Sequence, residues 1–138
     1  LGARYTVLGS DQPAGWKTVT NEPGGFVNLT RAFTPHENCS AYAVIYVRSP
    51  SARPAVLSAG SDDGIKAWFN RKLLISNNTS RGAARGQEKA EIALNAGWNE
   101  ILYKVTQGGG GWGFYLDLLD PATGKPLDDL VYAPTPGK

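Results

Sequence analysis

The stretch Ser61-Asp-Asp-Gly-Ile-Lys-Ala-Trp-Phe-Asn-Arg-Lys-Leu-Leu-Ile75 decides how this chain folds. Its side chains alternate, so three apolar residues share one face and three others share the opposite face: Ile65, Ala67 and Phe69 against Lys66, Trp68 and Asn70. A period of two is typical of a half-buried strand. Asp63-Gly64 before this strand and Asn70-Arg71 after it are turn signals, and the apolar residues that follow supply a returning strand. The stretch therefore predicts a β-hairpin.

Further segments of strand length recur along the chain. They cover residues 16–20, 26–33, 41–49, 55–59, 88–94, 99–106, 112–118 and 130–132. Segment 41–49 is apolar on both faces for most of its length, which is typical of a central strand covered on both sides. No stretch longer than a turn has the spacing of an amphipathic helix. The sequence predicts an all-β protein, built as two packed antiparallel sheets in a jelly roll or similar sandwich.

Three stretches together resemble the galactose-binding-like jelly-roll modules. They are the hairpin that begins Ser61-Asp-Asp-Gly, then Leu94-Asn-Ala-Gly-Trp-Asn-Glu-Ile-Leu-Tyr-Lys-Val105, and Gln107-Gly-Gly-Gly-Gly-Trp-Gly-Phe-Tyr-Leu116. Such modules are attached to bacterial glycoside hydrolases, polysaccharide lyases and other exported proteins, and PA14 sugar-binding domains have a similar Asp-Asp-Gly hairpin. The resemblance covers about residues 41–119. It implies an accessory module of a secreted or cell-envelope bacterial protein that binds a polysaccharide or oligosaccharide.

One residue of the hairpin departs from the family pattern, because Arg71 stands where the usual residue after the asparagine is glycine. If that position needs a left-handed backbone, arginine costs roughly 1 to 2 kcal/mol there. Otherwise the turn is of another type.

Length and charge limit the remaining possibilities. The 138 residues suit one domain over the whole of 1–138, with a Pro-rich, linker-like tail at about 133–138. The start at Leu1 suggests a piece cut from a longer protein, so neighbouring domains are expected partners. A net charge of +2 with scattered basic residues argues against nucleic acid as a partner. The sequence contains no run of 18 apolar residues, so it predicts no membrane span. We expect a monomer.

Catalytic groups are few in this sequence. His36 is the only histidine and Cys39 the only cysteine, so there is neither an internal disulfide nor a cysteine-rich zinc site. A Ser-His-Asp triad through His36 has no Gly-x-Ser-x-Gly elbow beside it. Asp62 and Asp63 are neighbours at the head of a strand and point apart, unlike the spaced carboxylates of a glycosidase. We expect no enzymatic activity, and a small hydrolase is the weakest alternative.

A sugar site would combine an aromatic ring with polar side chains on a loop. The exposed loop at 77–87 brings four candidates, Asn77, Asn78, Arg81 and Arg85. Trp68 either covers the outer sheet face or offers a stacking platform. Trp112 shares its face with Phe114, which favours the core, but the glycine run before it leaves it unshielded and keeps it a candidate. Trp98 is expected in the core, and Trp16 between two loops is undetermined.

Asp62 and Asp63 allow two interpretations. Their carboxylates can accept backbone N–H groups in the turn, or they can contact a sugar hydroxyl or a structural calcium ion. No other cofactor is expected. The sequence thus predicts a carbohydrate-binding module first, and second a structural or interaction domain that packs against neighbouring domains without a sugar site.

Overall fold

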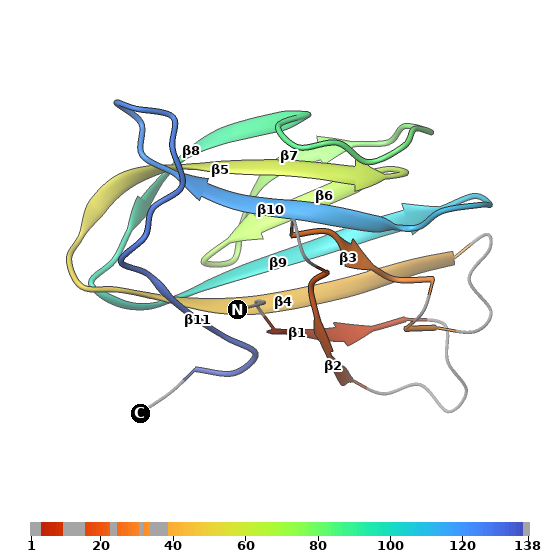
Figure 1. Cartoon of the computed structure of the whole chain (residues 1–138), viewed down its shortest axis with the longest axis horizontal. Coiled ribbons are helices and arrows are strands. Elements are labelled where there is room, and N and C mark those ends of the chain that lie inside the picture. Colours follow the sequence, from red (N-terminus) through yellow and green to blue (C-terminus); the bar gives the residue numbers. More distant parts are fainter. Residues whose placement is uncertain (1–3, 10–15, 23–24, 31, 34–38, 137–138) are drawn as a thin grey trace.

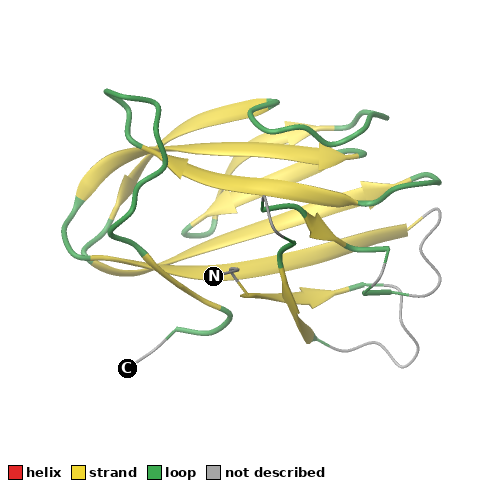
Figure 2. Ribbon diagram, viewed as in Figure 1, coloured by secondary structure: helices red, strands yellow, loops and turns green. Residues whose placement is uncertain are grey.

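The computed structural model describes residues 4–9, 16–22, 25–30, 32–33 and 39–136, which form two antiparallel β-sheets packed face to face (Figure 1). The predicted all-β sandwich is confirmed. Figure 2 shows strands and loops only in this part of the chain. It follows that no helix in the described ranges is long and apolar enough to cross a membrane.

The larger sheet has the order β2-β1-β4-β9-β6-β7, and β11 also pairs with β4. Its strands are β1 (Arg4–Leu8), β2 (Lys17–Thr20), β4 (Cys39–Ser49), β6 (Ile65–Phe69), β7 (Lys72–Asn77), β9 (Gly97–Gln107) and β11 (Val131–Ala133). The smaller sheet has the order β3-β10-β5-β8, made of β3 (Val27–Asn28), β5 (Arg53–Asp62), β8 (Glu88–Leu94) and β10 (Gly113–Leu119). The chain therefore changes sheets between β5 and β6.

The ladder between β4 and β9 is the centre of the larger sheet, with eleven consecutive residue pairs from Cys39↔Gln107 to Ser49↔Gly97. Ile101, Tyr103 and Val105 share the inward face of β9, since each is at most 1% exposed. The outward residues of β4 from Tyr42 to Tyr46 are half-buried, and Arg48 is exposed. The expectation that segment 41–49 is covered on both faces is therefore wrong, and its two tyrosines lie on a partly exposed surface.

Aromatic rings join the two sheets. Phe114 on β10 contacts Tyr103 on β9 and Tyr5 on β1, with ring centroids 5.1 and 5.2 Å apart. Trp112 is 1% exposed, and its indole N–H donates to the carbonyl oxygen of Val105 at 3.2 Å. Trp112 is thus a core residue, which is the interpretation that its shared face with Phe114 favours, and its buried ring offers no stacking platform.

The predicted hairpin is confirmed as β6 and β7, joined by the two-residue loop Asn70-Arg71. Both residues have positive φ, 47° and 71°, as a type I′ turn requires. Arg71 therefore does occupy a left-handed position. The Asn70 side chain offsets part of the cost, because its Oδ1 accepts the N–H of Glu100 at 2.8 Å and its Nδ2 donates to Asn99 Oδ1 at 3.0 Å.

One predicted boundary is wrong. Among the described residues of segment 26–33, only β3 is a strand, because Asn28 Oδ1 accepts the N–H of Thr30 at 3.1 Å and turns the chain there. At the start of the predicted tail, at about 133–138, the chain is still held to the larger sheet. Ala133 pairs with Tyr46 in β11, and the Thr6 hydroxyl donates to the carbonyl oxygen of Pro134 at 2.8 Å.

Replacing Arg71 with glycine is expected to stabilise the protein by roughly 0.5 to 1 kcal/mol. Glycine removes the left-handed penalty of about 1 to 2 kcal/mol but loses more backbone entropy on folding. Urea denaturation monitored by tryptophan fluorescence measures the change. Arg71→Ala is the matched control, because it removes the same side chain without relieving the backbone, and it is expected to leave stability nearly unchanged. A destabilised Arg71→Gly would contradict the assigned turn.

Candidate functional site

One end of the sandwich is held together by Asp63. Its backbone N–H donates to the carbonyl oxygen of Thr106 at 2.8 Å. Its carboxylate accepts the N–H of Arg81 at 3.0 Å through Oδ1 and the N–H of Gly108 at 2.9 Å through Oδ2. Asp63 therefore connects the β5–β6 turn, the loop at 78–87 and the glycine loop at 108–111. This is the backbone-acceptor role expected for a turn aspartate.

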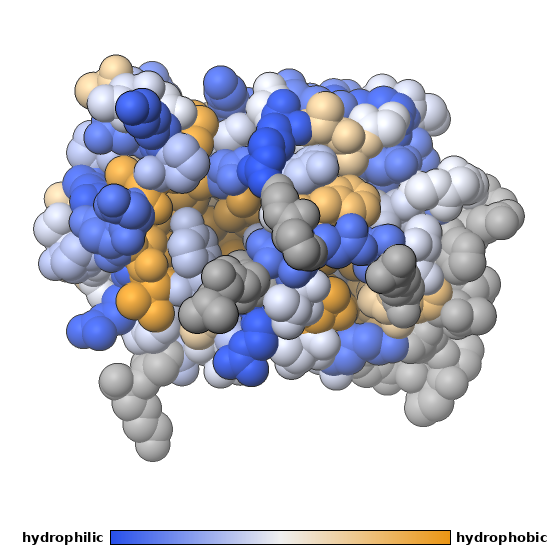
Figure 3. Space-filling model, viewed as in Figure 1, coloured by the Kyte–Doolittle hydropathy of each residue, from blue (hydrophilic) through white to orange (hydrophobic). Residues whose placement is uncertain are grey.

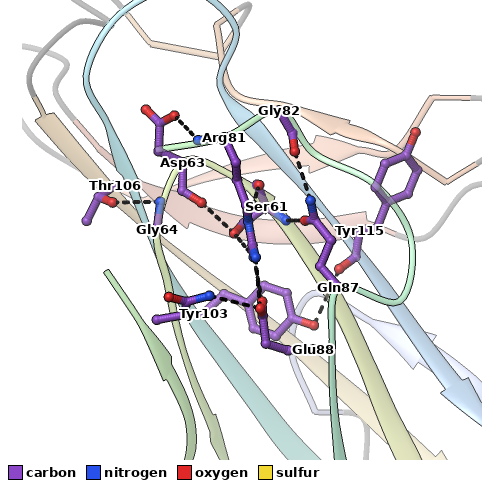
Figure 4. A network of polar contacts seen from close by, with 11 residues as sticks. Ser61, Asp63, Gly64, Arg81, Gly82, Gln87, Glu88, Tyr103, Thr106 and Tyr115 are labelled. Carbon is purple, nitrogen blue, oxygen red and sulfur yellow. Dashed lines mark hydrogen bonds and ion pairs between the residues drawn. The ribbon is translucent and has the colours of Figure 1, made fainter. Parts of the chain in front are cut away.

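Arg81 lies between Ser61 and Glu88 at the centre of a polar network (Figure 4). Its Nε donates to the Ser61 carbonyl oxygen at 3.1 Å and its Nη2 to Ser61 Oγ at 2.9 Å. Nη1 donates to Glu88 Oε2 at 2.8 Å, and Nη2 also contacts Glu88 Oε1. Every nitrogen of the guanidinium is engaged. Arg81 is therefore a structural residue, and the expectation that it contacts a ligand is not supported by its geometry.

Arg85 points to a different surface. Its Nη1 lies 2.8 Å from both carboxylate oxygens of Asp117, and its guanidinium carbon lies 4.9 Å from the centre of the Tyr115 ring. Asp117 and Tyr115 belong to β10, so Arg85 covers the smaller sheet. The loop thus does not bring its two arginines into one site with Trp68, which stands on the larger sheet.

A hollow of about 420 Å³ opens on the outward face of the larger sheet, near the end where β6, β7 and β9 meet. It is lined by Ile65 and by six polar side chains, Lys66, Ser76, Asn77, Asn78, Lys104 and Thr106. Asn77 and Asn78 are the predicted residues that this site includes. Asn77 also donates from Nδ2 to Glu88 Oε2 at 3.0 Å, which connects the hollow to the Arg81 network.

Lys66 and Lys104 are site residues that the sequence analysis missed. Each alternates with buried residues along its strand, and this alternation indicates from sequence that the side chain points outward. Their meeting depends on the pairing of β6 with β9, which is not visible in the sequence.

Trp68 is half-buried and lies on the same outward face, opposite Leu102 on β9. Leu102 lines a second hollow of about 390 Å³, together with Leu8, Trp16, Tyr42, Val44, Tyr46 and Glu100. Trp16 is 53% exposed. Trp98, expected in the core, is instead half-buried. Trp68 therefore lies between a polar hollow and a hollow lined by aromatic residues. We call the outward surface of the larger sheet, which carries Trp68 and both hollows, the outer face.

Asp62 lies beside Asp63 and the glycine loop. Burial, together with the smaller effects of the charge and the hydrogen bond of Asp63, raises the pKa of its carboxyl to about 6. A Cβ added to Gly111 would lie 2.9 Å from Asp62 Oδ2, so the glycine loop passes close to this carboxylate.

The residues around Asp62 fit a calcium ion in part. Carboxylate and amide oxygens are ligands that Ca²⁺ prefers, and the buried Oε1 of Gln107, whose Nε2 donates to Gly110, has no hydrogen-bond partner in the described structure. Over the described ranges, no three His, Cys, Asp or Glu side chains group together. A calcium ion held by Asp62 and Asp63 would thus need further oxygen atoms from backbone, water or ligand.

His36 lies outside the described residues. Cys39 is half-buried at the start of β4.

Comparison with known proteins identifies solved structures with a similar fold but does not identify a family. The chain matches no protein-family model and no curated protein. It is similar to the PA14 domain of the MpAFP antifreeze protein, with 18% identity over 70% of this chain and 53% of that one, and a TM-score of 0.54. An anti-sigma factor domain-containing protein is 18% identical over 94% of this chain and 45% of its own, with a TM-score of 0.63.

A β-glucosidase from Kluyveromyces marxianus, solved in complex with glucose, is 13% identical over 93% of this chain and 17% of its own, with a TM-score of 0.61. At these identities the likeness shows a shared fold. The chain spans about half or less of the length of these solved structures.

Replacing Arg81 with glutamine is expected to destabilise the protein by about 2 kcal/mol at neutral pH, because Glu88 would keep its partly buried charge without its partner. The Arg81 guanidinium lowers the pKa of Glu88. The ion pair therefore stabilises the fold above the ordinary carboxyl pKa and is lost as pH falls through the lowered value. The difference between wild type and variant should shrink below about pH 4.

Denaturation at pH 7 and pH 3.5 measures this difference. Arg85→Gln is the matched control, because its ion pair with Asp117 is 48% exposed on the arginine side and should contribute at most about 1 kcal/mol. Equal losses for Arg81→Gln and Arg85→Gln would contradict the role given to Arg81.

Proposed function

We propose that this chain is a non-catalytic carbohydrate-binding module, and that its sugar lies on the outer face, against Trp68 and the polar hollow beside it. The observation that supports this is the position of Trp68. It is half-buried on β6, a strand that lies between β9 and β7. The hydrogen-bonding side chains of the polar hollow lie beside it on the same face. Sugar recognition needs an apolar face for the C–H side of a pyranose and polar groups for its hydroxyls.

Rigidity favours this surface over the loops. A ring fixed by strand pairing loses little conformational entropy when a ligand binds, which favours affinity. The hollow supplies donors and acceptors from Ser76, Asn78 and Thr106. The β-glucosidase with bound glucose and the PA14 domain share the fold, which is in keeping with a module of carbohydrate-active or other exported proteins.

The module would then belong to a larger secreted or cell-envelope protein and have neighbouring domains. Asp62 and Asp63 are adjacent in sequence, and Asp63 is engaged by two backbone groups, which is unlike the two spaced carboxylates of a glycosidase. These features favour binding over hydrolysis.

The rival function is an interaction domain that packs against a neighbour. Val131 is 55% exposed and Leu73 is 47% exposed, and Figure 3 shows apolar residues at the surface among polar ones. Apolar surface of this kind also suits a protein partner. The two functions differ in whether the isolated module binds a glycan.

Truncating Trp68 to alanine is expected to weaken binding to a glycan that the wild type retains by about tenfold to a hundredfold. The estimate takes base stacking on aromatic rings, roughly 1 to 3 kcal/mol, as its guide. The melting temperature should change little, because the ring is half-buried and faces away from the core. A glycan array identifies the ligand, and isothermal titration measures the affinity.

The matched control is Trp112→Ala, which removes the same side chain from the core and is expected to cost roughly 3 to 5 kcal/mol of stability. Unchanged affinity in a folded Trp68→Ala protein would place the sugar elsewhere.

We further propose that Asp62 and Asp63 hold a structural calcium ion. A cation there would offset the repulsion between the two adjacent carboxylates. Millimolar Ca²⁺ is expected to raise the melting temperature of the wild type, EDTA should reverse the rise, and Asp62→Asn should show none. Glu91→Gln, an exposed residue on β8, is a control for the loss of one charge. A wild type that does not respond to Ca²⁺ would rule this site out.

A further inference from the structure

Resting on the proposed function, we infer that the sugar is acidic, and that the polar hollow of the outer face receives the carboxylate of a uronic acid residue between Lys66 and Lys104.

The two lysines are direct cross-strand neighbours. Lys66 on β6 pairs with Lys104 on β9, and both strands alternate so that these residues face outward while Ile65, Tyr103 and Val105 face inward. Directly opposed residues of antiparallel strands have Cβ atoms about 4.5 to 5.5 Å apart. Like charges in this position are destabilising. An anion between the two amines would convert that repulsion into attraction.

The protein does not neutralise these charges itself. In the ranges that the structure describes, neither lysine has a carboxylate at ion-pair distance, whereas Arg53, Arg81 and Arg85 each pair with one. Lys104 has a different contact, with its Nζ 5.9 Å from the centre of the Tyr42 ring. That contact keeps a positive charge near the sheet without cancelling it.

The nearest acidic residue on the same face of β9 is directed elsewhere. Glu100 is four residues from Lys104, which is roughly 13 Å along a strand. Its Oε2 accepts the hydroxyl of Tyr46 at 3.3 Å. The end of the outer face at Lys66 and Lys104 therefore keeps a positive charge that an anionic ligand can use.

Neutral groups in the hollow suit a sugar rather than a bare ion. Ser76 is opposite Lys66 on β7, and the exposed amide of Asn78 lies at the rim. Thr106 Oγ1 accepts the N–H of Gly64 at 3.0 Å, which leaves its own O–H to donate to a ligand. The volume of about 420 Å³ is in the range of pockets that bind small molecules.

The spacing also connects this charge to the stacking platform. Trp68 is two residues after Lys66 on the same face of β6, which is roughly 7 Å along the strand. A pyranose stacked on Trp68 can thus direct a carboxylate on its ring toward the two amines. Charge and platform together select a uronic acid over a neutral sugar.

The test compares acidic polymers with their neutral counterparts. Polygalacturonate, alginate and glucuronoxylan are each used beside the carboxyl-reduced form of the same polymer, which keeps the sugar backbone and removes the charge. The wild type is expected to bind at least one acidic polymer about tenfold more tightly than its reduced form. Lys66→Gln and Lys104→Gln should each weaken binding of the acid form about tenfold, since a hydrogen bond to a charged group contributes on that scale.

Lys125→Gln, an exposed lysine in a turn, is the control that loses the same charge elsewhere, and it should bind as the wild type does. Raising the salt to 0.5 M should weaken only the acid forms. Equal affinity for acid and reduced polymers, with both lost in Trp68→Ala, would overturn this inference and leave the proposed function standing. Chondroitin sulfate desulfated and intact is a further pair, and binding of the sulfated form alone would overturn the uronic acid assignment. Failure to bind any glycan, neutral or acidic, would overturn both.

Discussion

The arrangement of this molecule depends on how the chain is fixed where it leaves the smaller sheet for the larger one. Arg81 connects Ser61, the last residue but one of β5, to Glu88, the first residue of β8. Asp63 then ties the following turn to β9 through Thr106. With both ends of the turn held, β6 must pair with β9 in one register, and that register decides which side chains reach the outer face.

The same constraint explains which polar residues remain for a ligand. The loop at 78–87 looks suited to binding because it is rich in arginine, but Arg81 is used to hold the turn and Arg85 is paired with Asp117 on the other sheet. Lys66 and Lys104 make no comparable ion pair in the described ranges. The cationic groups open to a ligand therefore stand on strands, beside an aromatic ring that strand pairing keeps in place.

Much of the fold could be predicted from local pattern, because alternation shows which face of a strand is buried. The hairpin and the inward positions of Ile101, Tyr103 and Val105 follow from alternation alone. The site could be predicted only in part, because it depends on which strands become neighbours. Trp68 was identifiable as outward, but the meeting of Lys66 and Lys104 needs the β6–β9 register. For Trp112 the alternation favoured the core and the glycines beside it left a second interpretation open, which tertiary packing decides by burying its ring.

The central claim is that a sugar binds the outer face of the larger sheet and not the loop end of the sandwich. Titrating the ¹⁵N-labelled module with an oligouronate, followed by NMR, tests it directly, because each tryptophan contributes a separate indole N–H signal. The account predicts that the indole of Trp68 and the backbone amides of Lys66, Asn78 and Lys104 shift together, while the indole of Trp112 stays fixed. Shifts confined to Asp62, Asp63 and the glycines at 108–111, with Trp68 unchanged, would contradict it.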